Sequence, residues 1–145
     1  MYFNRMNKLI KLTCMFLWML GFHAQAEIAV VVNINSPIES FTHRELVDLY
    51  MGRNLFLPTG GLAVRIDQAP TSNIRKLFYQ ELVGKSVAEV NAYWAKLLFT
   101  GQSTPPYSLD SSKRVLEVIR NNVNAIGYIN AEEVDDTVKT VRTLP

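Results

Sequence analysis

The residues best placed to do chemistry in this chain surround a predicted helix start at Ser72. A predicted strand over 62–67 is followed by a short loop over 68–71, and a helical pattern begins at about Ser72. In open α/β sheets, ligands bind beyond the carboxyl ends of strands, which is where this loop lies. The first amide hydrogens of a helix lack acceptors, and the helix dipole makes this end positive. The Ser72 hydroxyl could also donate to an anion, and Arg75 or Arg65 could supply charge.

A second interpretation of these residues needs no ligand. Ser72 or Thr71 would simply cap the helix, as serine and threonine commonly do at this position. Arg75 would then be a solvated surface residue. The sequence leaves both interpretations open, so the anion site is a hypothesis at this point.

No residue pattern predicts catalysis, a metal or a cofactor. His43 falls in the first turn of a predicted helix, without a neighbouring cysteine, histidine or patterned carboxylate, so we expect a surface residue. The acidic cluster over 132–136 lacks the spacing and the glycine of a calcium loop, and we expect a solvated turn. Nucleophile–base pairs and phosphate loops are not recognisable either. The sequence therefore predicts a protein that is not an enzyme and has no cofactor.

The first 26 residues have the features of a cleaved signal peptide. Arg5, Lys8 and Lys11 form a basic start, residues 12–22 are mainly apolar, and Ala24-Gln25-Ala26 is a small-x-small cleavage site. The apolar run is shorter than the roughly 20 residues of a membrane anchor. We expect export to the periplasm, a mature chain that starts at Glu27, and no membrane anchor after cleavage.

Removing the signal changes the composition of the chain. It contains three of the 15 basic residues and none of the 13 acidic residues, which leaves a net charge of −1 for residues 27–145. Such a charge does not favour nucleic-acid binding. The only cysteine, Cys14, is removed as well, so packing without disulfides must stabilise one domain over 27–145.

Apolar patterns and helix signals predict alternating strands and helices. Two capping boxes, Thr42 with Glu45 and Ser86 with Glu89, mark helix starts, and another helix begins at Ser111 or Ser112. Residues 102–107 are expected to be loop. The predicted strands cover 27–33, 62–67, 125–129 and 138–143. This alternation predicts an α/β domain with a mainly parallel sheet flanked by helices.

The same patterns predict which side chains form the core. They are the inward-facing residues of the strands and of the apolar helix faces. The predicted core contains Val30, Val32, Leu46, Leu49, Val64, Leu77, Phe78, Trp94, Leu97, Leu116, Ile119, Ile126 and Tyr128.

Four segments in order resemble the second lobe of phosphate-type periplasmic binding proteins. They are the strand over 28–33, Thr42-x-x-Glu-Leu-x-x-x-Tyr-Met-Gly52-Arg53, Ser72-x-x-Arg75-x-x-Phe78, and Ala125-Ile-Gly-Tyr-Ile129. The Trp-x-x-x-x-Phe-Thr-Gly segment from Trp94 to Gly101 is similar to that of short PstS-like proteins. The resemblance implies one lobe of a type II periplasmic binding protein and a small oxyanion ligand such as phosphate.

The resemblance also places the ligand site and shows where this chain departs from the family. Ser72 matches the family's ligand serine, Gln68 stands where the family has an arginine, and Asn73 and Ile74 replace its glycine and threonine. The implied ligand-binding residues are Gln68, Ser72, Asn73 and Arg75. Two hypotheses follow: weak oxyanion binding linked to transport or sensing, completed by a homodimer when tight, or an accessory module that has lost the site and contacts an envelope protein.

Overall fold

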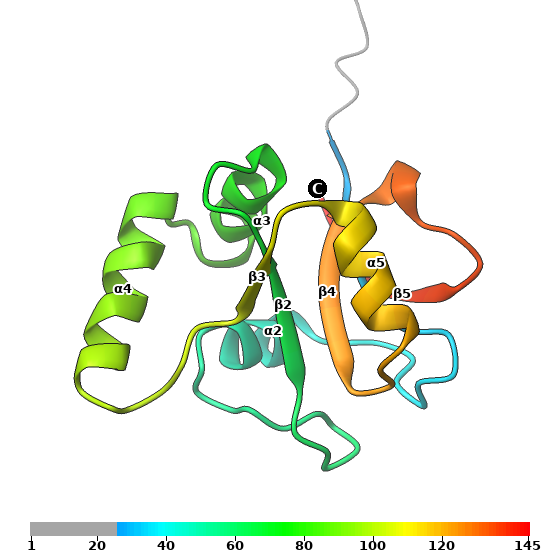
Figure 1. Cartoon of the computed structure of the whole chain (residues 1–145), viewed down its shortest axis with the longest axis horizontal. Helices are drawn as coiled ribbons and strands as arrows, with labels where there is room; N and C mark the ends of the chain where they lie inside the picture. The colour runs from blue at the N-terminus through cyan, green and yellow to red at the C-terminus, as the bar shows by residue number, and fades with distance from the viewer. Residues whose placement is uncertain (1–25) are drawn as a thin grey trace, which may run out of the picture.

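The computed structural model describes residues 26–145, so the predicted signal peptide lies outside it apart from Ala26. In this part of the chain, strands and helices alternate (Figure 1). No helix within 26–145 is long and apolar enough to cross a membrane. The strands are β1 (Ile28–Asn33), β2 (Val64–Gln68), β3 (Tyr107–Leu109), β4 (Ala125–Asn130) and β5 (Val138–Leu144). The helices are α2 (His43–Tyr50), α3 (Asn73–Val83), α4 (Val87–Phe99), α5 (Ser112–Arg120) and the short 3-10 helix η2 (Ala131–Glu133).

The five strands form one mixed sheet in the order β3-β2-β4-β1-β5. Strand β2 pairs in parallel with β3 and β4, whereas β1 is antiparallel to both β4 and β5. Four strands therefore run in one direction and β1 alone runs against them. The predicted α/β fold is confirmed, with the correction that half of the pairings are antiparallel. The pattern could not show this, because an apolar strand buried on both faces looks the same in either direction.

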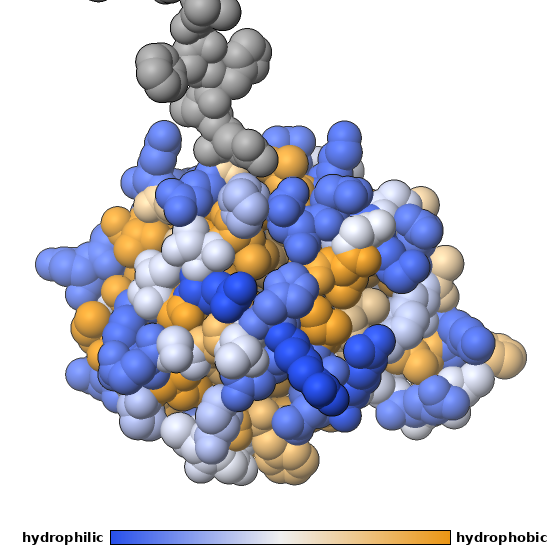
Figure 2. Space-filling view, turned by 180° about the vertical axis from the view of Figure 1, so that it is seen from behind, coloured by the Kyte–Doolittle hydropathy of each residue, from blue (hydrophilic) through white to orange (hydrophobic). Residues whose placement is uncertain are grey.

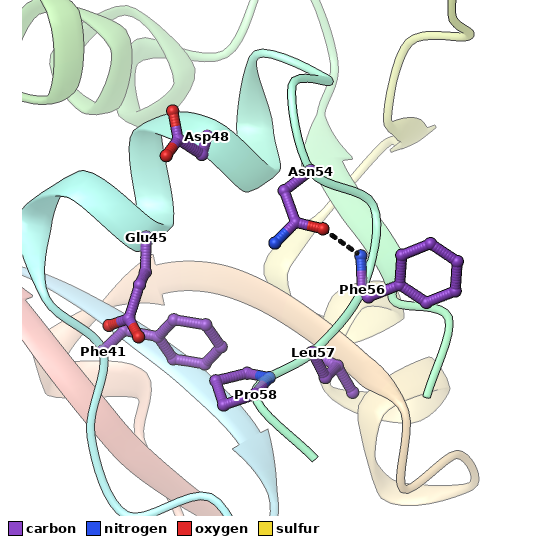
Figure 3. A pocket seen from close by; sticks show the side chains of 7 residues that line it. All are labelled: Phe41, Glu45, Asp48, Asn54, Phe56, Leu57 and Pro58. Atoms are coloured by element: carbon purple, nitrogen blue, oxygen red, sulfur yellow. Dashed lines mark hydrogen bonds between the residues drawn. The ribbon is translucent and has the colours of Figure 1, made fainter. Parts of the chain in front are cut away.

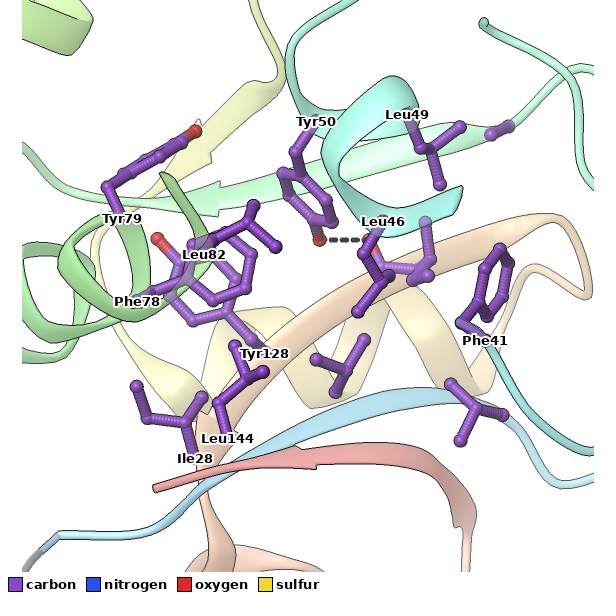
Figure 4. Close-up of a cluster of buried hydrophobic side chains, with 14 of the residues drawn as sticks. Ile28, Phe41, Leu46, Leu49, Tyr50, Phe78, Tyr79, Leu82, Tyr128 and Leu144 are labelled. Carbon is purple, nitrogen blue, oxygen red and sulfur yellow. Dashed lines mark hydrogen bonds between the residues drawn. The ribbon is translucent and has the colours of Figure 1, made fainter. Parts of the chain in front are cut away.

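Each face of the sheet has its own apolar cluster. In the larger one, α2 and α3 pack on the sheet, and the rings of Phe78 and Tyr128 stack with centroids 3.7 Å apart (Figure 4). In the smaller cluster, Val115 and Ile119 of α5 pack on the opposite face. A Cβ at Gly127 would lie 2.8 Å from the Val115 side chain, so this close approach of α5 requires a glycine.

The predicted core is confirmed except at its edges. Leu77, Leu97 and Leu116 are only partly buried, and Val64 is 36% exposed. Val64 is the first residue of β2. Helix α5 packs on Ile66, on the same face of the sheet, but does not cover Val64.

The loop predicted over 102–107 ends one residue earlier than expected, because β3 begins at Tyr107. This three-residue strand lacks an apolar pattern of its own and is defined by its pairing with β2.

The helix ends follow the local signals. Both predicted capping boxes are present, with Thr42 and Ser86 accepting from the amides of Glu45 and Glu89. Gly52 follows the end of α2 in a left-handed conformation with φ 72°. A Cβ at this position would lie 2.8 Å from the Trp94 ring, so glycine is needed for conformation and for space.

Several apolar side chains remain on the surface near element ends. Phe99, the last residue of α4, is 94% exposed, and its neighbour Leu98 is exposed as well. Tyr107 is exposed on β3, which forms one edge of the sheet. On the face behind that of Figure 1, apolar patches alternate with polar groups (Figure 2).

Candidate functional site

A polar pocket of about 360 Å³ lies at the carboxyl ends of three neighbouring strands. Strands β2, β3 and β4 run in parallel and end at the same edge of the sheet, where α3 and α5 begin (Figure 1). This is the edge at which open α/β sheets bind ligands. The pocket is lined by Gln68, Ala69, Thr71, Ser72, Asn73, Ile74, Asp110, Ser111, Ser112 and Asn130.

The first turn of α3 has no side-chain cap. Ser72 has the extended backbone of an N-cap residue, but its hydroxyl makes no capping hydrogen bond. By contrast, side chains cap α2, α4 and α5. In the ligand-free interpretation Ser72 or Thr71 caps the helix, and within residues 26–145 neither side chain makes such a bond. The amides at the start of α3 are left to bind water or a ligand at the positive end of the helix.

A second helix start faces the same pocket. Ser111 is the N-cap of α5 and accepts from the amide of Arg114, while Ser112 begins the helix. Both serines line the pocket together with Ser72 and Thr71. The Ser111 hydroxyl already donates to Asp110 at 3.3 Å, which leaves the hydroxyls of Thr71, Ser72 and Ser112 to donate to a group rich in acceptor oxygens.

Gln68 forms the buried floor of the pocket. Its side chain is the last of β2, and the residue is only 2% exposed. Nε2 donates to the carbonyl oxygen of Tyr128 at 3.1 Å and to the hydroxyl of Ser112 at 3.3 Å. Gln68 thus connects β2 with β4 and α5. A neutral amide holds these elements together at the position where the resemblance leads one to expect an arginine.

Arg75 lies under the pocket instead of facing it. The residue is 5% exposed, and its Nε donates to Asp67 at 3.0 Å while Nη2 donates to Asn91 at 3.0 Å. It is not among the lining residues, so the structure supports neither an Arg75 in direct contact with a ligand nor an Arg75 on the surface. The physical reason is Asp67, a buried carboxylate that needs a cationic partner.

Asp67 is the centre of a buried hydrogen-bond network below the site. Besides Arg75, its carboxylate accepts from the hydroxyls of Tyr79 and Tyr128 and from the backbone N–H of Gln68. Burial raises the pKa of Tyr79 and Tyr128 well above the usual tyrosine value, and the charge of Asp67 adds to this effect. Both tyrosines therefore remain protonated donors, which holds the end of β2 in place beneath the pocket.

Arg65, the other candidate for a positive charge, also points elsewhere. Its guanidinium donates to the carbonyl oxygens of Leu49 and Thr104, at 3.2 and 2.8 Å, and lies over the Trp94 ring. Burial lowers its pKa, but as a guanidinium it stays charged at neutral pH. Asp110 is thus the one charged side chain among the lining residues, and it is negative. The pocket can bind through amides and hydroxyls, without a cationic contact.

Three of the four implied site residues, Gln68, Ser72 and Asn73, are brought together in the pocket. Sequence reasoning missed the part of the pocket lining that comes from β3, α5 and β4, which includes Asp110 and Asn130. The sequence predicts a helix start at Ser111 or Ser112, but without β3 it does not place these residues beside Gln68. The missing signal was the pairing of Leu109 with Gln68, which is a tertiary contact.

A smaller pocket of about 100 Å³ lies elsewhere, beside α2 (Figure 3). Phe41, Leu57 and Pro58 form its apolar wall. Its two carboxylates already have partners, since Glu45 bonds the first turn of its own helix and Asp48 pairs with Arg53 at 3.5 Å. His43 is exposed, and no group of three or more possible metal ligands occurs in residues 26–145.

Comparison with known proteins finds similarity in structure. No family model matches the chain, and no curated protein matches its sequence. A Clostridium perfringens protein described as a phosphate ABC transporter substrate-binding protein, solved with bound phosphate, superimposes with a TM-score of 0.64 and 24% identity. The match covers 81% of this chain and 45% of that protein.

Two further solved structures are similar over the same share of the chain. An ABC-type phosphate transport receptor from Vibrio cholerae gives a TM-score of 0.64 with 19% identity, and PstS from Borrelia burgdorferi gives 0.60 with 15%. The matches cover 47% and 48% of those proteins, so this chain corresponds to about half of their length. The chain thus has the fold of a single lobe of a PstS-like substrate-binding protein.

Proposed function

We propose that the protein is a solute-binding protein that binds a small oxyanion, such as phosphate, weakly in the pocket at the start of α3. The observation that carries the proposal is the uncapped first turn at Ser72, whose amides line a pocket shared with the start of α5. The Clostridium protein of the same fold holds phosphate, which supports an oxyanion as the ligand class.

Weak binding follows from what the pocket lacks. Its lining contains no basic side chain, because Arg75 and Arg65 are committed to other partners. A hydrogen bond to a charged group contributes about 1.5–3 kcal/mol, so one missing contact weakens binding by about tenfold or more. In residues 26–145 the pocket is also open to solvent on one side. We expect phosphate affinity no better than high micromolar for a monomer, and tighter binding only if a second copy completes the cleft.

The proposed place of action is the periplasm, with a role in oxyanion transport or sensing. The support is the signal-like segment over 1–26 and the similarity to transporter substrate-binding proteins. N-terminal sequencing of protein from the periplasmic fraction should begin at Glu27. Full-length protein retained in the cytoplasm would contradict export.

Isothermal titration calorimetry of residues 27–145 tests the ligand site. Phosphate should give weak, salt-sensitive heats that are lost in Ser72→Asp, because the new carboxylate repels the anion and is itself a favourable N-cap side chain. Ser86→Asp is the matched control, since it introduces the same charge at the start of α4, away from the pocket lining. Nanomolar binding by a proven monomer, or heats that Ser72→Asp does not change, would refute the proposed site.

A second candidate function is an accessory module that contacts an envelope protein. It is favoured by the exposed apolar side chains of Leu98, Phe99 and Tyr107 and by the absence of a cation from the pocket lining. In that case no oxyanion should give heats, and Phe99→Ser should release a partner cross-linked in cells. The same variant should leave the calorimetry unchanged if the pocket is the functional site.

A further inference from the structure

The pocket that we assign to an oxyanion also contains acceptors that an oxyanion alone cannot satisfy. The carbonyl oxygen of Tyr128 can only accept, so the Nε2 atom of Gln68 must point toward it. In residues 26–145, all hydrogen bonds of the Gln68 side chain run through Nε2. Oε1 therefore has no protein donor, and because it is not itself among the buried atoms it can accept from a group in the pocket, although the residue as a whole is 98% buried.

A second amide has the same orientation. Nδ2 of Asn130 donates to Glu133 at 3.2 Å, and a carboxylate can only accept. This leaves Oδ1 of Asn130 as an acceptor on a residue that also lines the pocket. Both amides have their nitrogen atoms bound to the protein, so both have oxygen atoms available for a donor.

Asp110 adds a negative charge beside these oxygens. Gln68 pairs with Leu109 in the parallel β2–β3 ladder, so Asp110 follows directly at the end of the neighbouring strand. Neighbouring strands are about 4.8 Å apart, which places Asp110 next to Gln68 at the same edge. One oxygen of Asp110 accepts from the Ser111 hydroxyl at 3.3 Å, and its negative charge beside the amide oxygens favours a cation that carries donors.

The pocket is thus divided by its chemistry. One part consists of donors, namely the uncapped amides of α3 and the hydroxyls of Ser72 and Ser112. The other consists of acceptors, namely Oε1 of Gln68, Oδ1 of Asn130 and the carboxylate of Asp110. The volume of about 360 Å³ lies at the lower end of small-molecule sites, which range over about 300–1,000 Å³.

We propose that the pocket selects a small zwitterion, with its oxyanion group at the start of α3 and its ammonium group bound by Gln68, Asp110 and Asn130. This inference rests on the proposed function, because it uses the same helix start for the anionic end of the ligand. Amino acids and aminoalkyl phosphonates share this chemistry. The ammonium supplies the donors that the acceptors require and offsets the charge of Asp110.

Calorimetry with two matched pairs of probes tests the proposal on residues 27–145. Within each pair, 2-aminoethylphosphonate with ethylphosphonate and glycine with acetate, the probes differ mainly by the amine. The amine should raise affinity by about tenfold or more, the effect of one added charged hydrogen bond. The pair with the larger gain identifies a phosphonate or a carboxylate as the anionic end.

The preference must also depend on the acceptor side of the pocket. Asp110→Asn should bring the two members of a pair to within about threefold of each other, because the carboxylate that attracts the ammonium is gone. Asp136→Asn is the control, since Asp136 is an exposed carboxylate that is not part of the pocket lining. A preference for the amine that survives Asp110→Asn would overturn the proposal.

The outcomes separate this inference from the function on which it rests. If amine-bearing and amine-free probes bind equally and Ser72→Asp abolishes both, the oxyanion site is right and the zwitterion is wrong. If neither these probes nor phosphate bind, both proposals fail. If the amine-bearing probe binds better, and both Asp110→Asn and Ser72→Asp weaken it, both are supported.

Discussion

Helices α3 and α4 follow one another in the chain and both begin after a serine in an extended conformation, yet their first turns are bonded differently. The Ser86 hydroxyl accepts from the backbone N–H of Glu89, and the Glu89 carboxylate accepts from the backbone N–H of Ser86. Ser72 makes no such bond, and the residue three positions later is Arg75, which points down to Asp67. A glutamate at this position completes a cap, whereas an arginine anchors the helix to the core and leaves its amides free.

The comparison separates two ways of stabilising a helix. The amphipathic helix α4 is closed at its start by its own side chains and ends in the exposed Phe99. Helix α3 depends on tertiary contacts: Phe78 stacks on Tyr128, Tyr79 donates to Asp67, and Arg75 pairs with Asp67. Local sequence therefore stabilises the start of α4, while the core holds α3 and allows its start to remain available for binding.

The largest effect is expected from removing the aromatic anchor of α3. Phe78→Ala should lower the free energy of unfolding by about 3–5 kcal/mol, because it empties a fully buried site. Phe99→Ala, at the exposed end of α4, should change it by about 0.5 kcal/mol or less. Urea denaturation of both variants checks the contrast, which would be lost if the two costs were similar.

The buried ion pair of α3 should matter more than the exposed pair before α4. Arg75→Met should cost about 3 kcal/mol, because it leaves the Asp67 carboxylate buried without its cation. Lys85→Met removes a partner of Glu89 at 3.8 Å, where both side chains are about half exposed, and should cost less than about 1 kcal/mol. Equal costs in urea denaturation would mean that Asp67 is satisfied without Arg75.

Alkaline pH should weaken the network below α3. Burial raises the folded-state pKa of Tyr50, Tyr79 and Tyr128, so the folded chain keeps protons that the unfolded chain loses above about pH 10. Stability is thus complete below about pH 10 and falls as pH rises, by about 1.4 kcal/mol per pH unit for each tyrosine. Denaturation at several pH values should show that the free energy of unfolding falls less steeply with pH in Tyr79→Phe. An unchanged dependence on pH would mean that Tyr79 ionises in the folded protein.

The smallest effects compare the two serines directly. Ser86→Ala should cost about 1 kcal/mol, because it removes a capping bond and breaks the box. Ser72→Ala should be nearly neutral for stability, because there is no capping bond to lose, but it should weaken phosphate binding. Thermal denaturation and calorimetry of both variants measure the two effects, and a similar loss of stability in both would show that Ser72 caps α3 in solution.

Sequence alone determined those features in which neighbouring residues decide the structure. The buried strand of β1, both capping boxes and the loop that places Ser72 at a helix start follow from local patterns, and the ordered motifs indicated the lobe. Gln68, Ser72 and Asn73 could be assigned to one site because they are close in sequence at a strand end.

Only the tertiary structure decided the remainder, because it depends on contacts between residues far apart in the chain. The direction of β1 is set by its pairing with β4 and β5, and β3 exists only through its pairing with β2. That pairing brings Asp110 to Gln68 and gives the pocket its negative charge. The position of the Arg75 side chain could not be predicted either. Whether an arginine faces solvent, a ligand or a carboxylate depends on which partner the fold buries beside it.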